Sequence, residues 1–219
     1  MTAKDFLNKI RVENNAELSI KQKMLYVLLN FVFGIILGFL SKYIEAIPHF
    51  GIFGDFLNLL GDISSKIGMW IFIATIISCW SQAPGLGAIN VFAFVSGMLL
   101  TYYIYSMKLF GFFPTHYFLR WGLIAFASPL AAYIVWFGRG TGWIAALCAA
   151  LPIGLLIEQG FSFFYSFSPS HGFDIVVSVI LFILLPTKKY QRLRVLPLVF
   201  FIAFILRHFN ILSYFIGGL

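Results

Sequence analysis

Seven long apolar runs, separated by short stretches rich in Gly, Pro and charged residues, dominate this sequence of 219 residues. A helix needs roughly 20 predominantly apolar residues to cross the roughly 30 Å of hydrocarbon in a bilayer. The sequence therefore predicts an all-α, polytopic transmembrane helix bundle. The spans that we expect cover residues 24–46, 67–81, 87–107, 117–138, 142–163, 172–186 and 195–217.

The composition excludes most other classes of protein. Hydrophobic residues make up 61% of the chain and charged residues 11%, whereas soluble domains are about half apolar and about a quarter charged. So few charges cannot cover the surface of a soluble domain of this size. A disordered chain, a disulfide scaffold and a nucleic-acid-binding module are excluded on the same grounds.

Two of the expected spans, residues 67–81 and 172–186, are short for a bilayer. The first can gain length from the segment that precedes it, and Pro186 fixes the end of the second. Six spans with one re-entrant or surface helix are therefore the alternative to seven spans.

The distribution of basic residues predicts the orientation, because Lys and Arg accumulate in cytoplasmic loops. With the N-terminus inside and seven spans, four basic residues lie outside: Lys42, Lys66, Lys108 and Arg120. Ten lie inside: Lys4, Lys9, Arg11, Lys21, Lys23, Arg139, Lys188, Lys189, Arg192 and Arg194. We therefore expect a cytoplasmic N-terminal segment (1–24), a single transmembrane domain (25–219), a cytoplasmic loop at 187–194 and an external C-terminus.

The N-terminal segment carries two local helix signals. Leu7 and Ile10, with Phe6, share a helical face opposite the basic residues, a pattern typical of an interfacial helix. Ser19 and Gln22 form a capping box before the first apolar run. The first long helix should therefore begin near residue 20.

Small residues spaced four apart predict close helix packing. The hydrophobic effect does not drive helices together within a bilayer, so they associate where small side chains let their backbones approach closely. The pairs are Gly34 with Gly38, Ala93 with Gly97, Ala127 with Ala131, Ser128 with Ala132, Ala145 with Ala149, Ala146 with Ala150, and Ala150 with Gly154. Pro129 and Pro152 lie inside two spans, where they either open a cavity or adjust packing. The Ser128 hydroxyl is placed to satisfy one carbonyl that such a proline frees.

Residues 50–66 follow the helical period in their apolar positions, which predicts an amphipathic helix on the outer surface. We expect Phe53, Phe56 and Leu60 to be buried. Asp55 and Asp62, with Lys66, form the opposite, polar stripe. The helix is then either an interfacial anchor or a lid whose two carboxylates face the mouth of the bundle.

Two ionisable residues lie within expected spans, where such groups are costly and mark either function or a structural pair. We expect Glu158 and Arg207 to face the bundle interior and to neutralise each other. Gln159 and His208 are their polar neighbours. The candidate ligand-binding residues are thus Glu158, Gln159, Arg207, His208, Asp55 and Asp62.

No motif predicts a metal site, a cofactor or catalysis. The four histidines, His49, His116, His171 and His208, lie on different segments without ligand spacing. The chain carries no nucleophile elbow, zinc-protease motif or phosphate-binding loop. An enzyme is therefore the less favoured class, and we expect no cofactor.

Several stretches of the first half resemble a family of small polytopic membrane proteins of Gram-positive bacteria with no assigned function. They are residues 70–78, 88–94, 97–98 and 111–114, about a quarter of the chain. The resemblance implies a bacterial plasma membrane. In size the chain is also similar to the membrane-embedded substrate-binding subunits of vitamin-type transporters, although these typically carry Ala-x-x-x-Ala where this chain has Gly34 and Gly38.

Two functions remain open from the sequence. The first is a transport-related role, with a small molecule bound or passed through the bundle. The second is a non-catalytic accessory or scaffold subunit of a membrane complex, in which the polar pair is structural. The expected partners are the lipid bilayer, membrane or cytoplasmic subunits and a small-molecule ligand, with no nucleic acid.

Overall fold

The computed structural model describes residues 3–13, 18–46 and 50–210. The protein is all-helical, with 86% helix and no strand among the residues described. The elements are α1 (Ala3–Ile10), α2 (Ile20–Ala46), α3 (Gly51–Ser65), α4 (Ile67–Trp80), α5 (Pro84–Phe110), α6 (Thr115–Trp136), η1 (Phe137–Arg139), α7 (Trp143–Gly160), α8 (Phe163–Ser166), α9 (Pro169–Leu184) and α10 (Lys189–His208).

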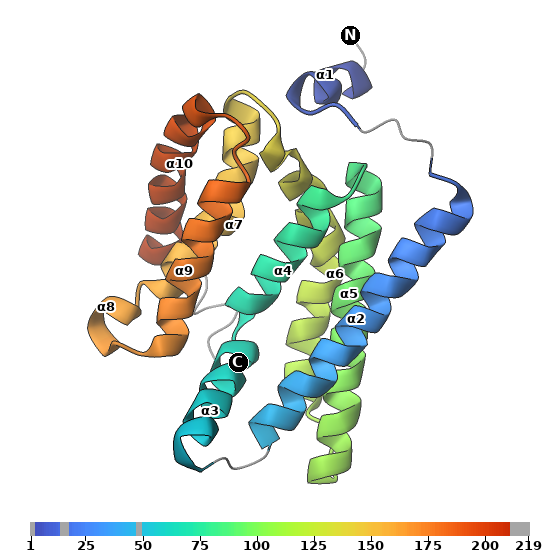
Figure 1. The fold of residues 1–219 in the computed structure, drawn as a ribbon, viewed down its shortest axis with the longest axis vertical. Helices are drawn as coiled ribbons and strands as arrows, with labels where there is room; N and C mark the ends of the chain where they lie inside the picture. The colour runs from blue at the N-terminus through green and yellow to red at the C-terminus, as the bar shows by residue number, and fades with distance from the viewer. Residues whose placement is uncertain (1–2, 14–17, 47–49, 211–219) are drawn as a thin grey trace.

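Two groups of helices stand side by side with their axes roughly parallel (Figure 1). One group holds α2, α5 and α6, and the other holds α7, α9 and α10, with α4 packed between them. The short helix α1 lies at one end of the bundle and α3 at the opposite end. The two ends of the bundle are therefore covered by different segments of the chain.

Among the described residues, four stretches are long and apolar enough to cross a membrane: Ile20–Ala46, Pro84–Phe110, Thr115–Arg139 and Trp143–Ser166. The pair α3 and α4 passes the same test together but is bent by 69° at its break. These helices are compatible with an integral membrane protein, whereas seven spans remain a prediction. The helix α9 has 16 residues, about 24 Å of rise, which is shorter than the hydrocarbon thickness of about 30 Å.

The predicted start of the first long helix is confirmed. The backbone N–H of Ser19 donates to Gln22 Oε1 over 2.9 Å, and the N–H of Gln22 donates to Ser19 Oγ over 3.3 Å. This reciprocal pair satisfies two of the N–H groups that a helix start leaves unpaired. The helix therefore begins at Ile20, inside the segment that the sequence assigns to the N-terminal region.

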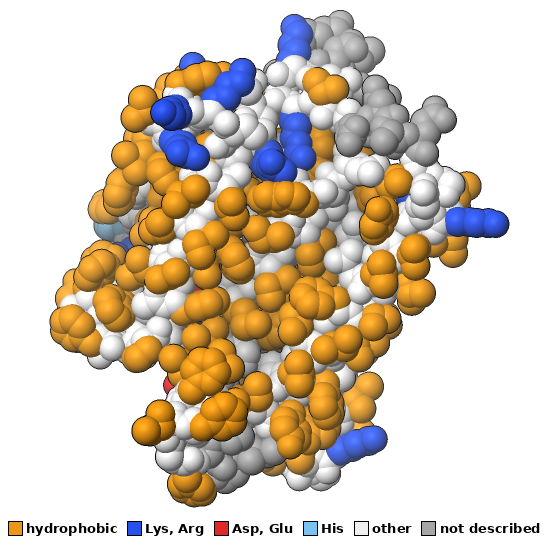
Figure 2. Space-filling view, in the orientation of Figure 1, with side chains coloured by type: hydrophobic (Ala, Val, Ile, Leu, Met, Phe, Trp, Pro, Cys, Tyr) orange, Lys and Arg blue, Asp and Glu red, His pale blue; other side chains and the backbone are white. Residues whose placement is uncertain are grey.

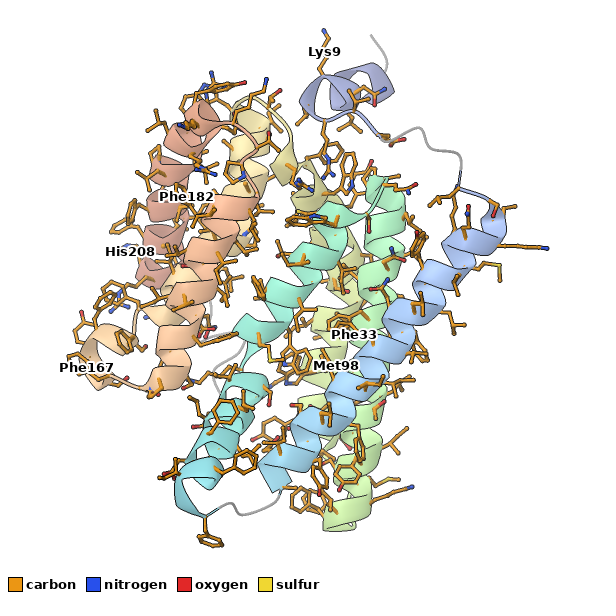
Figure 3. The ribbon with its side chains drawn as sticks, in the orientation of Figure 1. Lys9, Phe33, Met98, Phe167, Phe182 and His208 are labelled. Atoms are coloured by element: carbon orange, nitrogen blue, oxygen red, sulfur yellow. The ribbon has the colours of Figure 1, made fainter. Side chains whose placement is uncertain are left out.

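The helices α2 and α5 touch backbone to backbone through three glycines, as the small-residue spacing predicts. A Cβ atom added at Gly38 would lie 2.4 Å from the carbonyl oxygen of Met98, and Figure 3 shows Met98 where α2 crosses α5. An added Cβ at Gly34 would lie 2.1 Å from the oxygen of Phe94, and one at Gly97 would lie 2.3 Å from that of Phe31. Only glycine permits this approach.

The carbonyl that the proline in α6 frees is satisfied within the same turn of the helix. Pro129 removes the backbone donor for the carbonyl of Ala125. The Ser128 hydroxyl donates to that carbonyl over 2.8 Å. The expected role of Ser128 is thus confirmed.

The helix α3 forms where the sequence predicts an amphipathic helix, but of its three residues expected to be buried, Leu60 is half-buried and Phe53 and Phe56 are exposed. Phe53 is 73% exposed and Phe56 is 54% exposed. The residues that α3 buries include Gly54 and Ile63. The expectation fails because a helix in or on a bilayer can present apolar side chains to lipid, so an apolar face does not require a protein partner.

The loop expected at 187–194 is shorter than predicted, because α10 begins at Lys189. Gln191 is fully buried and joins this helix start to the turn before α7. Its Nε2 donates to the carbonyl of Gly142 over 2.6 Å, and its Oε1 accepts from the N–H of Gly142 over 3.3 Å. The side chain thus satisfies both backbone groups of one glycine, whose φ of +95° is in the left-handed region.

Candidate functional site

An aromatic pocket opens at the end of the bundle where α3 and the C-terminal ends of α2 and α5 lie. Its volume is about 310 Å³, at the lower end of the range of roughly 300–1,000 Å³ for small-molecule sites. Two charged side chains from α2 and rings from α5 and α6 line it. The lining residues are Lys42, Glu45, Ser65, Tyr102, Tyr103, Ser106, Phe110, Phe112, Pro114, Tyr117 and Trp121.

The charged side chains of the pocket bind each other and one phenol. Lys42 Nζ lies 2.9 Å from Glu45 Oε1, and the Tyr102 hydroxyl donates to Glu45 Oε2 over 2.6 Å. The Lys42 ammonium also lies 5.0 Å from the ring centre of Tyr102 and 5.1 Å from that of Phe110. Because the Lys42 side chain is 7% exposed and that of Glu45 is 34% exposed, the carboxylate is the group that a ligand reaches first.

The glycine contact between α2 and α5 sets this geometry. Gly38 lies against the backbone of Met98, and one helical turn later Lys42 and Tyr102 follow on the same faces. Two helix axes that approach this closely bring the next pair of side chains into contact. The small-residue spacing of the sequence therefore positions a charged residue of the pocket.

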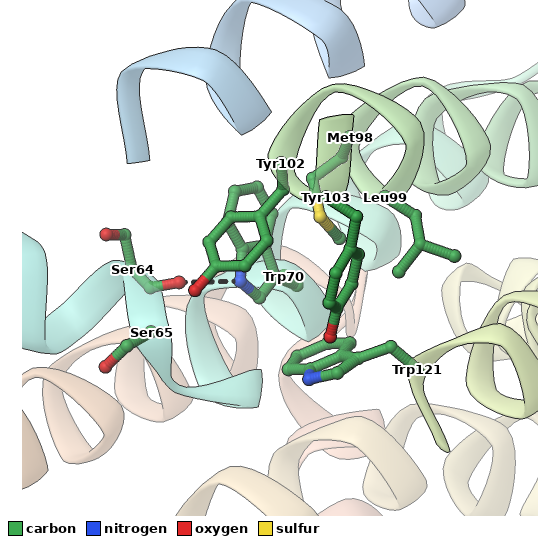
Figure 4. Close-up of a pocket in the computed structure, with 8 residues that line it drawn as sticks. All are labelled: Ser64, Ser65, Trp70, Met98, Leu99, Tyr102, Tyr103 and Trp121. Carbon is green, nitrogen blue, oxygen red and sulfur yellow. Dashed lines mark hydrogen bonds between the residues drawn. The ribbon is translucent and has the colours of Figure 1, made fainter. Parts of the chain in front are cut away.

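A narrower extension continues the pocket toward the break between α3 and α4 (Figure 4). Ser65, Tyr102, Tyr103 and Trp121 line both parts. The innermost ring belongs to Trp70, which is 5% exposed and whose Nε1 donates to the carbonyl of Ser64 over 2.9 Å. The extension has a volume of about 30 Å³, so it holds about one water-sized group.

Edge-to-face ring contacts hold the aromatic wall in place. The ring centres of Tyr103 and Phe118 lie 5.3 Å apart at 86°. Those of Phe113 and Phe118 lie 5.1 Å apart at 62°. Such pairs add to the stability that burial of the rings provides. The wall is therefore preformed around the pocket.

The predicted pair Glu158 and Arg207 does not form a buried ion pair. Arg207 is exposed near the end of α10, and its guanidinium carbon lies 4.0 Å from the ring centre of Phe161. Glu158 is half-buried on α7, and no ion pair joins the two charges in the part of the chain that the structure describes. The expectation that Arg207 faces the interior is wrong, because a guanidinium is weakly hydrated and can rest on an aromatic face at the surface. The two charges still lie near enough to interact electrostatically.

The other predicted site residues are separated from one another. His208 is exposed on α10 (Figure 3) and stacks on Phe204 with ring centres 5.7 Å apart. Asp55 and Asp62 are exposed on α3, and neither lines the pocket described above. Gln159 is half-buried, and its carbonyl oxygen lies 3.2 Å from His171 Nδ1. The structure therefore does not bring the six candidate residues into one site.

A second polar cluster surrounds the break between α3 and α4, and sequence reasoning missed it. Lys66 at the break donates to Ser170 Oγ over 2.7 Å and lies 3.2 Å from His171 Nε2. Asp174, one turn along α9, is 1% exposed. The signals for this cluster were three polar residues at the start of an apolar run and a lysine between two apolar helices, but nothing local indicates that the two segments meet.

The end of the bundle opposite the pocket is closed by the N-terminal segment. The Arg11 guanidinium donates to the carbonyl of Cys79 over 2.9 Å and to that of Trp136, and it stacks 3.8 Å from the ring centre of Trp136. Ile10 is buried, and its carbonyl accepts from the N–H of Thr141 over 2.9 Å. Burial lowers the pKa of Arg11 to about 10, so the guanidinium keeps its charge at neutral pH. The sequence pattern placed Arg11 opposite the apolar face of Leu7 and Ile10 and did not indicate these contacts.

No group of three or more His, Cys, Asp or Glu side chains that could hold a metal ion occurs among the described residues. His116 is exposed, and His171 bonds within the second polar cluster. His49 lies outside the described residues. Cys79 and Cys148 are both buried free thiols.

No family model, no curated protein and no solved structure matches this chain. The resemblance to small polytopic membrane proteins of Gram-positive bacteria thus remains a prediction.

Proposed function

We propose that this protein is an integral membrane protein of a bacterial plasma membrane with a transport-related function, and that it binds a small molecule in the aromatic pocket. The observation that carries the proposal is a preformed pocket of about 310 Å³ with a Lys42–Glu45–Tyr102 cluster on its wall. A pocket with apolar walls and a few convergent polar groups is the usual form of a ligand site.

The chemistry of the wall indicates the kind of ligand. Rings of Tyr103, Tyr117 and Trp121 offer flat apolar surfaces, on which an apolar or aromatic body packs well. Glu45 supplies a carboxylate, and Lys42 supplies an ammonium that is already paired. The pocket therefore suits a small amphipathic molecule that is neutral or carries one positive group toward Glu45.

The charge distribution supports an orientation for the bundle. Lys and Arg side chains gather at the end where α1 and the start of α10 lie (Figure 2). The pocket opens at the other end. By the positive-inside rule this favours a cytoplasmic N-terminus and a pocket that faces outward. Labelling of Tyr190→Cys in intact cells tests this, and access from outside the cell would contradict it.

The binding experiment compares two tryptophan substitutions on one helix. Ser106 is buried and lines the pocket, whereas Ile104 is 50% exposed and does not. Native mass spectrometry of the purified protein should detect a copurified small molecule, and Ser106→Trp should remove it. Ile104→Trp is the matched control and should retain it. Equal retention in both variants would contradict the proposed site.

An accessory or scaffold subunit is the alternative function. The tightly packed half of the bundle favours it, because four alanines of α7 are fully or almost fully buried against neighbouring helices. If the purified protein holds no ligand and crosslinks in cells to a larger membrane subunit, this alternative replaces the transport-related function.

A further inference from the structure

The break between α3 and α4 places a backbone interruption beside buried polar groups. The two helices meet at 69° around Lys66, whose φ of −92° and ψ of 153° are extended. A new helix start leaves its first N–H groups without intrahelical partners and carries partial positive charge. The start of α4 is therefore a place where a negative group is stabilised.

Asp174 of α9 supplies that negative group. A Cβ atom added at Gly68, the second residue of α4, would lie 1.9 Å from Asp174 Oδ1. Only the missing side chain of Gly68 lets the carboxylate reach the start of α4. Asp174 is 1% exposed, and its Oδ2 has no hydrogen-bond partner among the described residues. A buried carboxylate oxygen without a partner is costly, and a bound proton or cation removes that cost.

The charges around Asp174 favour a proton over a metal cation. Lys66 is the charged group that acts on Asp174, and its ammonium is already held by Ser170 and His171. A second cation beside Lys66 would be repelled, whereas a proton neutralises the carboxylate. Asp62 on α3 is exposed and acts on Lys66.

The other elements packed against α9 add few charges. The helix α4 carries no charged side chain between Ile67 and Trp80. On α7, Glu158 interacts with Arg207 of α10. His171 on α9 itself bonds Lys66 through Nε2 and the carbonyl of Gln159 through Nδ1. His171 is thus the one neighbouring group on α9 whose titration must be separated from that of Asp174.

We propose that Asp174 is a proton-binding site that controls the hinge between α3 and α4. As a carboxylate it holds α9 against the start of α4. When Oδ2 takes a proton from hydronium, one O–H bond forms on the carboxyl group, one breaks in hydronium and a water molecule is left. The charge that attracts the start of α4 is then lost and the hinge loosens.

The hinge is part of the pocket wall. Ser64 and Ser65 precede the break, Trp70 follows it, and all three line the inner extension of the pocket. A movement at Lys66 therefore changes the distance between Ser65 and Trp70. Protonation of Asp174 would thus change the shape of the pocket, although the proposal itself does not depend on a ligand there.

A thiol-labelling experiment on the full-length protein tests the proposal. In a Cys79→Ala, Cys148→Ala background, Ile67→Cys reports opening of the hinge, because Ile67 is 7% exposed at the start of α4. Ser65→Cys, at an exposed position on the other side of the break, corrects for the pH dependence of thiol chemistry. The labelling rate of Ile67→Cys divided by that of Ser65→Cys should rise at least about fivefold when the pH falls from about 8 to about 5.5.

Two variants should show, at both pH values, the high ratio of labelling rates that the unchanged protein shows at about pH 5.5. Asp174→Asn removes the charge, and Gly68→Ala leaves every titratable group in place but displaces the carboxylate from α4. Gly68→Ala keeps the test decisive if Asp174→Asn does not fold. A ratio that is independent of pH when Gly68 and Asp174 are both intact, or that still changes with pH in Asp174→Asn, would overturn the proposal.

Two further measurements identify the ligand of the site. In His171→Asn the ratio should still change with pH, and loss of the change would assign the effect to His171 and overturn the proposal. Replacing Na⁺ by choline at constant pH should leave the ratio unchanged. A change on that replacement would indicate a metal-cation site instead of a proton site and would also overturn it.

Discussion

The two ends of the bundle use charged side chains in opposite ways. At the closed end, the Arg11 guanidinium binds the carbonyl oxygens at the ends of α4 and α6. At the open end, Lys42 and Glu45 bind each other beside a pocket of about 310 Å³. The last carbonyls of a helix have no intrahelical donors. At the closed end, the charged side chain therefore supplies the hydrogen bonds that two helix ends lack. At the open end, the partly exposed Glu45 carboxylate remains available to a ligand.

Because of this difference, substitutions at the closed end should affect stability, and substitutions at the open end should affect binding. A side chain that satisfies buried backbone groups leaves them unpaired when it is removed, and this costs stability. A partly exposed ion pair contributes little to stability.

Gly38→Ala should have the largest effect, because the added methyl group would overlap the backbone of Met98. The two helices must separate, and we expect a loss of about 3 kcal/mol in the free energy of unfolding together with loss of a pocket ligand. Thermal unfolding in detergent and native mass spectrometry measure both. Gly122→Ala is the control, since nothing lies within 4 Å of its added Cβ.

Arg11→Met should destabilise the protein by about 2 kcal/mol, because the carbonyls of Cys79 and Trp136 lose a charged donor. The methionine keeps much of the apolar contact with the Trp136 ring. The same unfolding measurement applies, with Lys21→Met at an exposed position as the control. If stability is unchanged and ligand binding at the open end is lost, the contrast between the two ends is wrong.

Glu45→Gln should change the free energy of unfolding by about 1 kcal/mol or less, because a glutamine oxygen can still accept from Tyr102 or Lys42 although the buried Lys42 loses its opposite charge. It should lower the affinity for a positively charged ligand about tenfold, equivalent to about 1.4 kcal/mol. The amount of copurified ligand, measured by mass spectrometry, checks this. A large loss of stability with unchanged ligand would assign Glu45 to structure.

Glu158→Gln and Arg207→Leu should have the smallest effects. Arg207 is exposed on the ring of Phe161, so we expect each change to cost about 0.5 kcal/mol or less and the double variant to cost their sum. A double-mutant cycle in thermal unfolding measures the coupling. Strong coupling would indicate that Glu158 and Arg207 form the structural ion pair that the sequence predicted.

Local features of the fold were predictable from the sequence, because their physical causes lie within one or two helical turns. The capping box of Ser19 and Gln22 and the bond from Ser128 to the carbonyl that Pro129 frees are of this kind. The small-residue spacing also predicted close packing, although the partner of α2 came only from the structure.

Long-range features were not predictable. Lys42 and Glu45 were visible as a charged pair three residues apart, but the Tyr102 phenol that joins them is 57 residues away. Lys66 and Ser170 are separated by 104 residues. The burial of Phe53 was predicted wrongly because an apolar stripe indicates an apolar surrounding, which in a bilayer can be lipid as well as protein.

The glycine contact between α2 and α5 separates what gives the pocket its shape from what gives it its chemistry. Gly38 and the backbone of Met98 set the distance between the helices, and neither residue lines the main pocket of about 310 Å³. The residues that a ligand touches, such as Glu45 and Tyr117, lie elsewhere and do not carry this contact. Ligand preference can therefore diverge through substitutions in the wall while the bundle keeps its architecture, so one scaffold can evolve to serve several molecules.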